Sequence, residues 1–324
     1  LDLALRSRIA RESIDSRFYY EPILSAHPAK KSEKTYPFLN KKLRVPIWVS
    51  SMTGGTTMAR TINRNLARAC GEFGMGMGLG SCRMLLDDDS HIKDFDVRDL
   101  IGHDLPLFGN LGIAQLEQLV NDDRLQVIDV LIEKLQLDGM IIHVNPMQEW
   151  FQPEGDRLGR SPLESIRIML ETVNYPVIVK EVGQGMGLES LEALFRLPLA
   201  AIDFGASGGT NFALLEQLRA DDNGLQDLTP LVHVGHDALE MVEMTNLLVH
   251  QLGDRMKCHQ VIISGGVQNF LDGYFLMHKI QTNAIYGQAS AFLRHATGSY
   301  EHLQKYIDAQ IQGLRMAQTY LKVK

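Results

Sequence analysis

Cysteine is scarce in this chain, which carries it only at positions 70, 82 and 258 among 324 residues. These cysteines are widely spaced and form no Cys-x-x-Cys pair, which argues against a zinc site or a redox dithiol and favours reduced thiols. No segment contains the roughly 20 apolar residues of a membrane span, and the N-terminus lacks the apolar core of a secretory signal. We therefore expect a cytoplasmic protein with no membrane partner.

Positive charge is also in short supply. The chain has 32 Lys and Arg against 39 Asp and Glu, a net charge of −7 and a pI of about 5.9. A general nucleic-acid binder needs a surplus of Lys and Arg, so we expect no nucleic-acid partner, and any phosphate group must be bound by a local site. Hydrophobic residues make up 45% of the chain, enough for one large (β/α)8 barrel or two smaller α/β domains.

Short apolar or β-branched runs alternate with segments of helical period from residue 45 onward, a pattern typical of parallel α/β folds. Eight strands are predicted at 45–51, 75–80, 105–111, 139–145, 176–182, 200–205, 260–265 and 283–287. Helices are predicted at 57–73, 115–121, 162–172, 188–195, 238–252, 269–279 and 300–323. Eight strand–helix units favour a single closed TIM barrel over residues 45–324, because no low-complexity linker divides them.

The first 44 residues do not follow this rhythm. A short helical pattern at 3–10 is followed by prolines at 22, 28 and 37. We interpret residues 1–44 as an N-terminal arm or lid over one barrel end, with a disordered tail as the alternative.

The polar run 143–156 is the strongest functional signal. It brings one histidine, several amides and several acids directly after the apolar segment 139–142. A buried strand that ends in such side chains is how a barrel enzyme builds its site. A polar loop that merely caps a helix is the alternative.

Glycine-rich loops follow four predicted strands, at 51–55, 76–81, 205–210 and 264–267. Glycine allows positive φ and lets backbone N–H groups approach an anion, although tight βα turns also use it for packing. The loop at 264–266 and the one at 287–289 follow the seventh and eighth strands, where barrels commonly bind phosphate. They favour a phosphate-bearing cofactor.

Lys180 ends the apolar strand 176–179 and should point into the barrel mouth. It could form an ion pair with Asp203 on the neighbouring strand. Alternatively, it could lie beside an electron-rich cofactor ring, where a fixed positive charge would stabilise a reduced flavin.

Several motifs together resemble the type 2 isopentenyl diphosphate isomerases over most of the chain. They are Met52-Thr53-Gly54-Gly55, Gly80-Ser81-Cys82-Arg83, Gly109-Asn110-Leu111-Gly112, His143-Val144-Asn145-Pro146-Met147-Gln148-Glu149, Gln152-Pro153-Glu154-Gly155-Asp156, Val179-Lys180-Glu181-Val182-Gly183, Gly208-Gly209-Thr210 and Ser264-Gly265-Gly266.

The resemblance implies an FMN barrel enzyme that interconverts isopentenyl and dimethylallyl diphosphate. It implies Mg2+, NADPH as flavin reductant, and a homo-oligomer, tetrameric or octameric. FMN would be bound by Met52, Thr53, Gly54, Ser81, Asn110, Lys180, Thr210, Gly265, Gly266, Val267, Gly287, Gln288 and Ala289. The diphosphate substrate would contact Ser81, Cys82, Arg83, His143, Asn145 and Gln148. Glu149 would bind Mg2+, and Gln148, Lys180 and His143 would be catalytic.

The implied chemistry agrees with these residue types. Moving a double bond requires protonating one carbon and deprotonating another, and the amide of Gln148 has no useful pKa for either step. Reduced FMN is therefore the expected acid/base. Lys180 would act on the flavin electrostatically, Arg83 and His143 on the diphosphate. Glu149 offers the hard oxygen that Mg2+ prefers.

Three departures from the family pattern stand out. The family's N-terminal Arg-Lys-x-x-His stretch, which contacts the diphosphate, is replaced by residues 8–14, where Arg8 and Arg11 are the remaining cations. Cys82 stands where the family has Gln. Residues 232–236 replace a Trp-Gly-Ile-Pro-Thr run and bring in two histidines, at 233 and 236, which could be new polar contacts or, with a third ligand, bind metal.

Two other functions are compatible with such a barrel. An FMN-binding paralogue that has lost isomerase activity is favoured by the altered N-terminal arm. An FMN-dependent α-hydroxy acid oxidase is disfavoured, because residues 207–210 contain neither the His nor the Arg that those enzymes carry beside a Gly-Gly pair.

Overall fold

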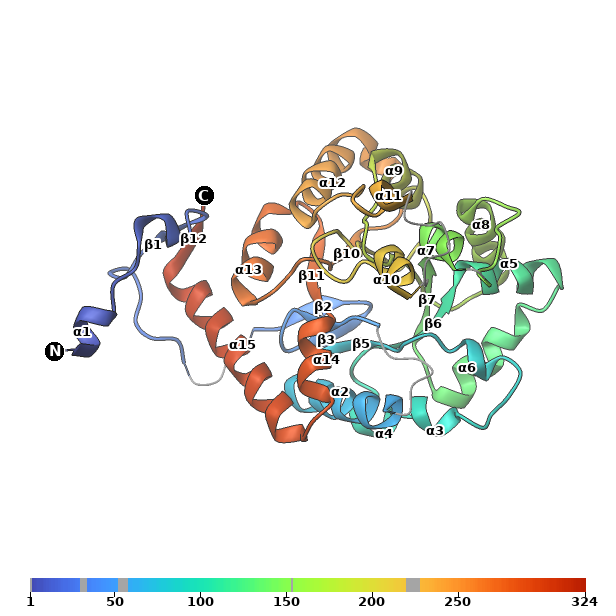
Figure 1. Ribbon diagram of the computed structural model, residues 1–324, viewed down its shortest axis with the longest axis horizontal. Helices are drawn as coiled ribbons and strands as arrows, with labels where there is room; N and C mark the ends of the chain where they lie inside the picture. Colours follow the sequence, from blue (N-terminus) through green and yellow to red (C-terminus); the bar gives the residue numbers. More distant parts are fainter. Residues whose placement is uncertain (1, 30–33, 52–57, 153, 220–227) are drawn as a thin grey trace.

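The computed structural model describes the whole chain except residues 1, 30–33, 52–57, 153 and 220–227. Its centre is a closed barrel of eight parallel strands in the order β10-β11-β4-β5-β6-β7-β8-β9 (Figure 1). The strands are β4 Ile47–Val49, β5 Gly76–Gly78, β6 Leu107–Gly112, β7 Gly139–Val144, β8 Val177–Glu181, β9 Ala201–Asp203, β10 Gln260–Ile263 and β11 Asn283–Gln288. The predicted TIM barrel is confirmed, and each strand lies within or next to its predicted range.

Side chains of several strands fill the barrel interior. Trp48 of β4 is completely buried, and its ring lies against β5. A Cβ added at Gly76 would meet the Trp48 ring at 2.4 Å, and one at Gly78 would meet Ile141 Cδ1 at 2.5 Å. Two glycines on β5 are therefore required so that a large ring and a β7 side chain can share the interior.

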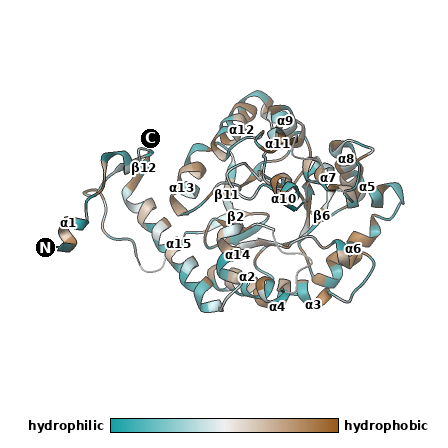
Figure 2. Ribbon diagram, viewed as in Figure 1, coloured by the Kyte–Doolittle hydropathy of each residue, from teal (hydrophilic) through white to brown (hydrophobic). Residues whose placement is uncertain are grey.

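Helices surround the barrel and bury one face each (Figures 1 and 2). The longer ones are α2 Ala59–Phe73, α5 Ile113–Asn121, α6 Gln126–Leu135, α8 Pro162–Thr172, α9 Leu188–Phe195, α10 Phe212–Arg219, α12 Ala238–Leu252, α13 Phe270–Lys279 and α15 Tyr300–Tyr320. Shorter ones are α3 Ile92–Phe95, α4 Arg98–Ile101, α7 Pro146–Phe151, α11 Thr229–Val232 and α14 Ser290–Ala296. Ser161, Asp237 and Asn269 cap α8, α12 and α13 through their side chains, which satisfies backbone N–H groups at those helix starts.

The end of the chain differs from the predicted helix over 300–323. Helix α15 stops at Tyr320, and β12 Leu321–Val323 pairs antiparallel with β1 Phe18–Tyr20. The Tyr274 hydroxyl donates to the Leu321 carbonyl at 2.8 Å, and the Phe18 ring packs against Tyr274. Pairing with a distant segment overrides the helical pattern here.

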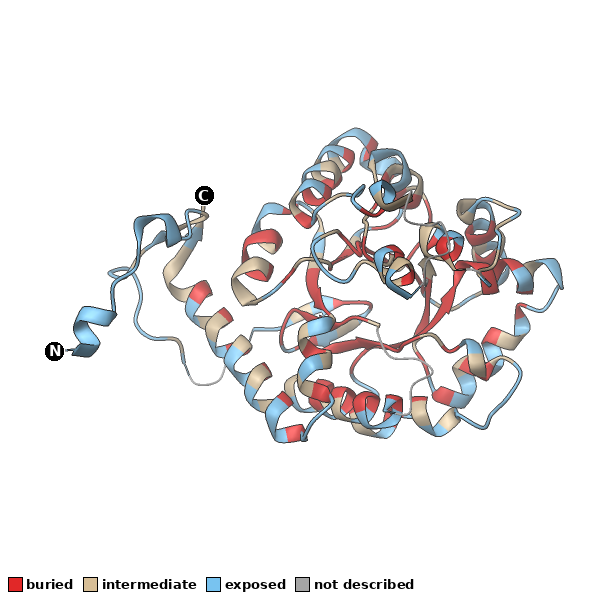
Figure 3. Cartoon of the chain, viewed as in Figure 1, coloured by how far each residue is buried: buried red, intermediate tan, exposed pale blue. Residues whose placement is uncertain are grey.

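The first part of the N-terminal arm, residues 2–29, lies beyond α15, at the side of the barrel (Figures 1 and 3). Its first elements, α1 Asp2–Arg6 and a 3-10 turn at Arg11–Ser13, bury no residue. A hairpin of β2 Tyr36–Phe38 and β3 Lys41–Leu43 follows, and its Phe38 and Leu43 belong to the barrel core. A lid role for the arm stays a prediction.

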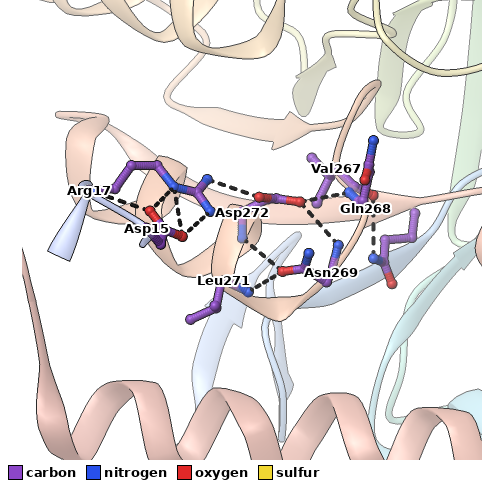
Figure 4. A network of polar contacts seen from close by, with 8 residues as sticks. Asp15, Arg17, Val267, Gln268, Asn269, Leu271 and Asp272 are labelled. Atoms are coloured by element: carbon purple, nitrogen blue, oxygen red, sulfur yellow. Dashed lines mark hydrogen bonds and ion pairs between the residues drawn. The ribbon is translucent and has the colours of Figure 1, made fainter. Parts of the chain in front are cut away.

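A polar network anchors the arm to the barrel (Figure 4). The Arg17 guanidinium forms ion pairs with Asp15 at 2.7 Å and with Asp272 at 2.9 Å. Asp272 also accepts the backbone N–H groups of Gln268 and Asn269 at 3.0 and 3.2 Å. The arm is thus connected to the loop that follows β10.

Candidate active site

A cavity of about 1300 Å3 opens at the carboxyl ends of the barrel strands. Most of the predicted site residues line it: Ser81, Arg83, Asn110, His143, Gln148, Lys180, Thr210, Gly265, Gly266, Val267, Gly287, Gln288 and Ala289. Each of the eight strands contributes to this cavity through its last residues or through the loop that follows it. Chain-distant residues meet there because parallel strands in a barrel deliver their C-terminal ends to one face.

Three predicted residues do not line the cavity, and three others cannot be placed. Cys82, Asn145 and Glu149 are buried outside its lining. Met52, Thr53 and Gly54 lie outside the described residues.

His143, at the end of β7, is neutral in this environment. Burial, followed by the nearby charge of Lys180, lowers the pKa of His143 to about 4. Its Nδ1 lies 2.6 Å from Asn110 Oδ1, which can only accept, so the Nδ1 proton is donated there. The free Nε2 is then an acceptor, and His143 brings no positive charge to the cavity at neutral pH.

Lys180 lies next to Asp203, which is one of the two interpretations that the sequence left open, and it also lines the cavity. Its place beside a cofactor ring stays a prediction. Its Nζ is 3.8 Å from Asp203 Oδ2 and donates to the Glu181 carbonyl at 2.8 Å. Burial raises the pKa of Asp203, whereas the Lys180 charge and a short hydrogen bond from Ser264 Oγ lower it. A buried lysine is thereby held beside the cavity by a buried carboxylate.

The Glu181 carboxylate shapes the loop after β8. It accepts backbone N–H groups from Gly183, Gln184 and Gly185 at 2.7, 2.6 and 2.8 Å. Gly183 has φ +138°, and a Cβ there would meet the Thr210 carbonyl oxygen at 2.2 Å. This close approach joins the loops after β8 and β9 at the cavity rim.

The amide of Gln148 is fixed in orientation by two neighbours. Asn145 Nδ2 donates to Gln148 Oε1 at 3.1 Å, and Gln148 Nε2 donates to Glu216 Oε1 at 3.1 Å. Glu216 on α10 is buried and also accepts from Arg219 at 3.1 Å. No strand-end or glycine pattern marks Glu216, so sequence reasoning missed it.

Glu149 lies behind Gln148, and both of its carboxylate oxygens already accept hydrogen bonds. Oε1 accepts from Asn145 Nδ2 at 2.8 Å, and Oε2 accepts from the Asp156 backbone at 3.1 Å. Among the described residues no group of three or more His, Cys, Asp or Glu is arranged to hold a metal ion. The Mg2+ role of Glu149 stays a prediction.

The residues of the three departures from the family pattern do not line the cavity. Cys82 is completely buried, its Sγ contacts the Gly80 carbonyl at 3.4 Å, and burial raises its thiol pKa to about 12. His236 Nδ1 pairs with Glu240 at 2.9 Å, and His233 is exposed. Arg8 and Arg11 are exposed on the arm and do not line the cavity.

Further lining residues were not predicted. Ser50, Ser51, Asp87, Ser264 and Gln268 adjoin predicted loops, so the same strand-end rule could have found them. Arg294, His295 and Tyr306 come from α14 and α15 and carry no such signal.

The residues present fit a flavin mononucleotide. The hydroxyls of Ser50 and Ser51 are buried and have no hydrogen-bond partner among the described residues, so polar ring atoms of a cofactor could satisfy them. Gly265 has φ +88°, and a Cβ there would lie 2.0 Å from the Ala206 carbonyl oxygen. Only glycine fits at this position. Its backbone N–H donates to no described residue and is available to a phosphate.

Solved structures establish the fold independently. A flavocytochrome b2 mutant with benzoylformate superposes with a TM-score of 0.64, covering 94% of this chain and 76% of that chain at 14% identity. A mandelate oxidase mutant with a monooxide FMN adduct superposes with a TM-score of 0.56. It covers 95% of this chain and 88% of that chain at 12% sequence identity. At this identity the likeness concerns the fold alone.

Curated relatives are much more similar in sequence, although no protein-family model matches the chain. An isopentenyl-diphosphate delta-isomerase of Rickettsia africae (strain ESF-5) is 37% identical over 284 residues, 87% of this chain and 79% of that protein. The proteins of the same name from Rickettsia felis (strain ATCC VR-1525 / URRWXCal2) and Rickettsia typhi (strain ATCC VR-144 / Wilmington) are 35% and 34% identical over 287 residues, 88% of this chain and 79% and 80% of theirs. With its closed barrel and type 2 motifs, the chain belongs to the isopentenyl-diphosphate delta-isomerases.

Proposed function

We propose that this protein interconverts isopentenyl and dimethylallyl diphosphate, with reduced FMN as the acid/base and Mg2+ on the diphosphate. The family membership supports the reaction, and the flavoprotein barrels of similar fold support the cofactor. The observation that carries the proposal is the cavity that unites Gln148, neutral His143 and Lys180.

The described residues that line the cavity include few groups suited to carbon protonation. Asp87 is the one carboxylate among them, and His143 becomes a cation only near pH 4. The reduced flavin, when bound, supplies the proton donor and acceptor that allylic isomerisation requires. The chain's own part is then to bind, orient and stabilise.

Each residue has a distinct part in this proposal. Lys180, held by Asp203, keeps a positive charge beside the flavin. Gln148, clamped by Asn145 and Glu216, positions the isoprenoid carbons through a fixed amide. Arg83 donates to the diphosphate.

Two parts depend on the substrate's diphosphate. His143 would bind a proton at Nε2 once the negative charge of the diphosphate raises its pKa, and Nε2 would then donate to a phosphate oxygen. Glu149 would hold Mg2+, whose charge would neutralise part of the diphosphate. Glu149→Gln should therefore raise the Mg2+ concentration needed for half-maximal rate; an unchanged requirement would remove Glu149 from the metal site.

The direct test is anaerobic incubation of the purified protein with FMN, NADPH, Mg2+ and isopentenyl diphosphate. Formation of dimethylallyl diphosphate is expected. If the flavin is bound and reduced but no product forms, the chain is a flavin-binding paralogue without isomerase activity. Oxidation of α-hydroxy acids by the same preparation would instead support the oxidase alternative, which the loop at 207–210 disfavours.

Assembly and partners remain part of the proposal. A tetramer or octamer is expected, with a small diphosphate as the substrate and no nucleic acid bound. Light scattering of the purified protein distinguishes these states from a monomer. No helix among the described residues has the length and apolar character to cross a membrane.

A further inference from the structure

One end of the cavity is built by the loops after β10 and β11 together with α14 and α15. Backbone N–H groups of Gly265, Gly266 and Val267 donate no hydrogen bond to the described residues. The next two amides, of Gln268 and Asn269, are already bound by Asp272 (Figure 4). These three residues line the cavity, so their unbonded amides are available to a ligand there, and the Arg17–Asp272 pair holds the loop through Asp272.

Backbone amides alone leave a phosphate monoester without a counter-charge. Such a group carries about −1.5 to −2 charges at neutral pH. Among the described residues, β11 and the loops after β10 and β11 supply neutral polar side chains at this end, such as Ser264, Gln268 and Gln288, and no charged ones. A charged partner must therefore come from a neighbouring element.

Arg294 of α14 is that charge. Among the described residues lining the cavity, the other Lys and Arg side chains are Arg83 and Lys180, and both have carboxylate neighbours, Asp156 at 3.7 Å and Asp203 at 3.8 Å. Arg294 forms no ion pair with any carboxylate of the described residues and is exposed toward solvent.

The surroundings of Arg294 form a polar wall. His295 stacks on the Tyr306 ring at 4.3 Å, and the Tyr306 hydroxyl donates to Gln288 Oε1 at 3.4 Å. Arg294 lines the cavity together with His295 and Tyr306. Burial raises the pKa of Tyr306, whereas the hydrogen bond with Gln288 and the charge of Arg294 lower it. Gln288 in turn donates to the Val267 carbonyl at 3.3 Å, so α15, the β11 loop and the β10 loop are joined.

We infer that Arg294 is a cofactor-binding residue whose guanidinium holds the terminal phosphate of FMN against the open amides of Gly265, Gly266 and Val267. This inference rests on the proposed use of FMN. The sequence motifs did not include Arg294 in the cofactor site, because it lies within a helix.

The test compares flavins with and without the phosphate. Apoprotein is titrated with FMN and with riboflavin, and flavin fluorescence gives each dissociation constant. Arg294→Gln should weaken FMN binding about tenfold or more, since a charge-assisted hydrogen bond is lost, and change riboflavin binding less than twofold. Arg294→Lys should restore part of the FMN affinity.

Lys305→Gln is the matched control, because Lys305 is exposed, neighbours Tyr306 in sequence and does not line the cavity. It removes the same charge and should leave FMN affinity unchanged. The dependence of FMN affinity on NaCl concentration should flatten in Arg294→Gln only, because a phosphate–cation contact is screened by salt. This salt dependence tests the role even when riboflavin binds too weakly to measure.

Three outcomes overturn the inference: unchanged FMN affinity in Arg294→Gln, equal losses for FMN and riboflavin, or an equal loss in Lys305→Gln. Failure of the unaltered protein to bind either flavin contradicts the proposed cofactor itself. The two failures are therefore distinguishable.

Discussion

Protonation of His143 should destabilise the protein on acidification. Its pKa is lowered from 6.5 to about 4 in the folded state, so the unfolded chain binds more protons between those values. Folding stability must then rise with pH across the window 4 to 6.5, and the contribution is lost as the pH falls. Between pH 7.5 and 4.5 the linkage relation gives about 2.5 kcal/mol for this one group.

The comparison that isolates this contribution is with His143→Gln, which keeps a donor for Asn110 and removes the titration. Urea unfolding at pH 7.5 and 4.5 gives the free energy of unfolding of both proteins. The unaltered protein should lose about 2.5 kcal/mol more than the variant. His250→Gln, a change at an exposed histidine on α12, serves as the control and should behave like the unaltered protein.

Other buried groups act in the opposite direction and make the difference measurement necessary. Burial raises the pKa values of Glu181 and Asp203. Each carboxyl therefore binds its proton at a higher pH in the folded protein than in the unfolded chain, and this favours folding as the pH falls. These contributions are common to both proteins and cancel. Equal losses in the unaltered protein and in His143→Gln would refute the lowered pKa of His143 and its neutral state.

Three further predictions concern other residues around the cavity. Asp203→Asn leaves Lys180 without its carboxylate and should lower the free energy of unfolding by about 3 kcal/mol, and adding Lys180→Met should recover part of this loss. Urea unfolding measures both, and strictly additive losses in the double variant would mean that the two side chains are not coupled. Gln148→Ala should abolish turnover while FMN fluorescence stays quenched, and retained turnover would remove Gln148 from the chemistry. Cys82 should resist alkylation in the folded protein, because burial raises its pKa to about 12; rapid modification at pH 8 would contradict its placement.

The barrel was predictable because its signal is local and repeated. Each strand is a short apolar run flanked by turn residues, as at 139–144 and 177–181, and the rule that parallel strands end at one face then assembles the site. The side chains at strand ends, such as His143 and Lys180, could be placed at the cavity for the same reason.

Other features depend on contacts that no local pattern encodes. The strand β12 forms because the arm supplies β1, although residues 321–323 continue a helical pattern. Arg294 lines the cavity and Glu216 binds the cavity residue Gln148, and both come from helices, where spacing indicates only which face is apolar. The direction in which Glu149 points depends on how helix α7 is rotated about its axis. Its carboxylate accepts hydrogen bonds from Asn145 and Asp156, and it does not line the cavity.

The described lining of the cavity contains three Lys and Arg side chains, Arg83, Lys180 and Arg294, and the surroundings of each determine whether it is available to a ligand anion. Lys180 is 8% exposed, and a charge so buried requires a resident partner, which Asp203 provides whether or not a ligand is bound. The Arg83 side chain is 62% exposed and lies 3.7 Å from the Asp156 carboxylate. Such a solvated ion pair contributes little free energy, so a phosphate can replace the carboxylate at little cost. Arg294 has no carboxylate partner among the described residues. Ligand phosphates are therefore expected at Arg83 and at Arg294. The charge of Lys180 is expected to act on the flavin ring between these two phosphate sites.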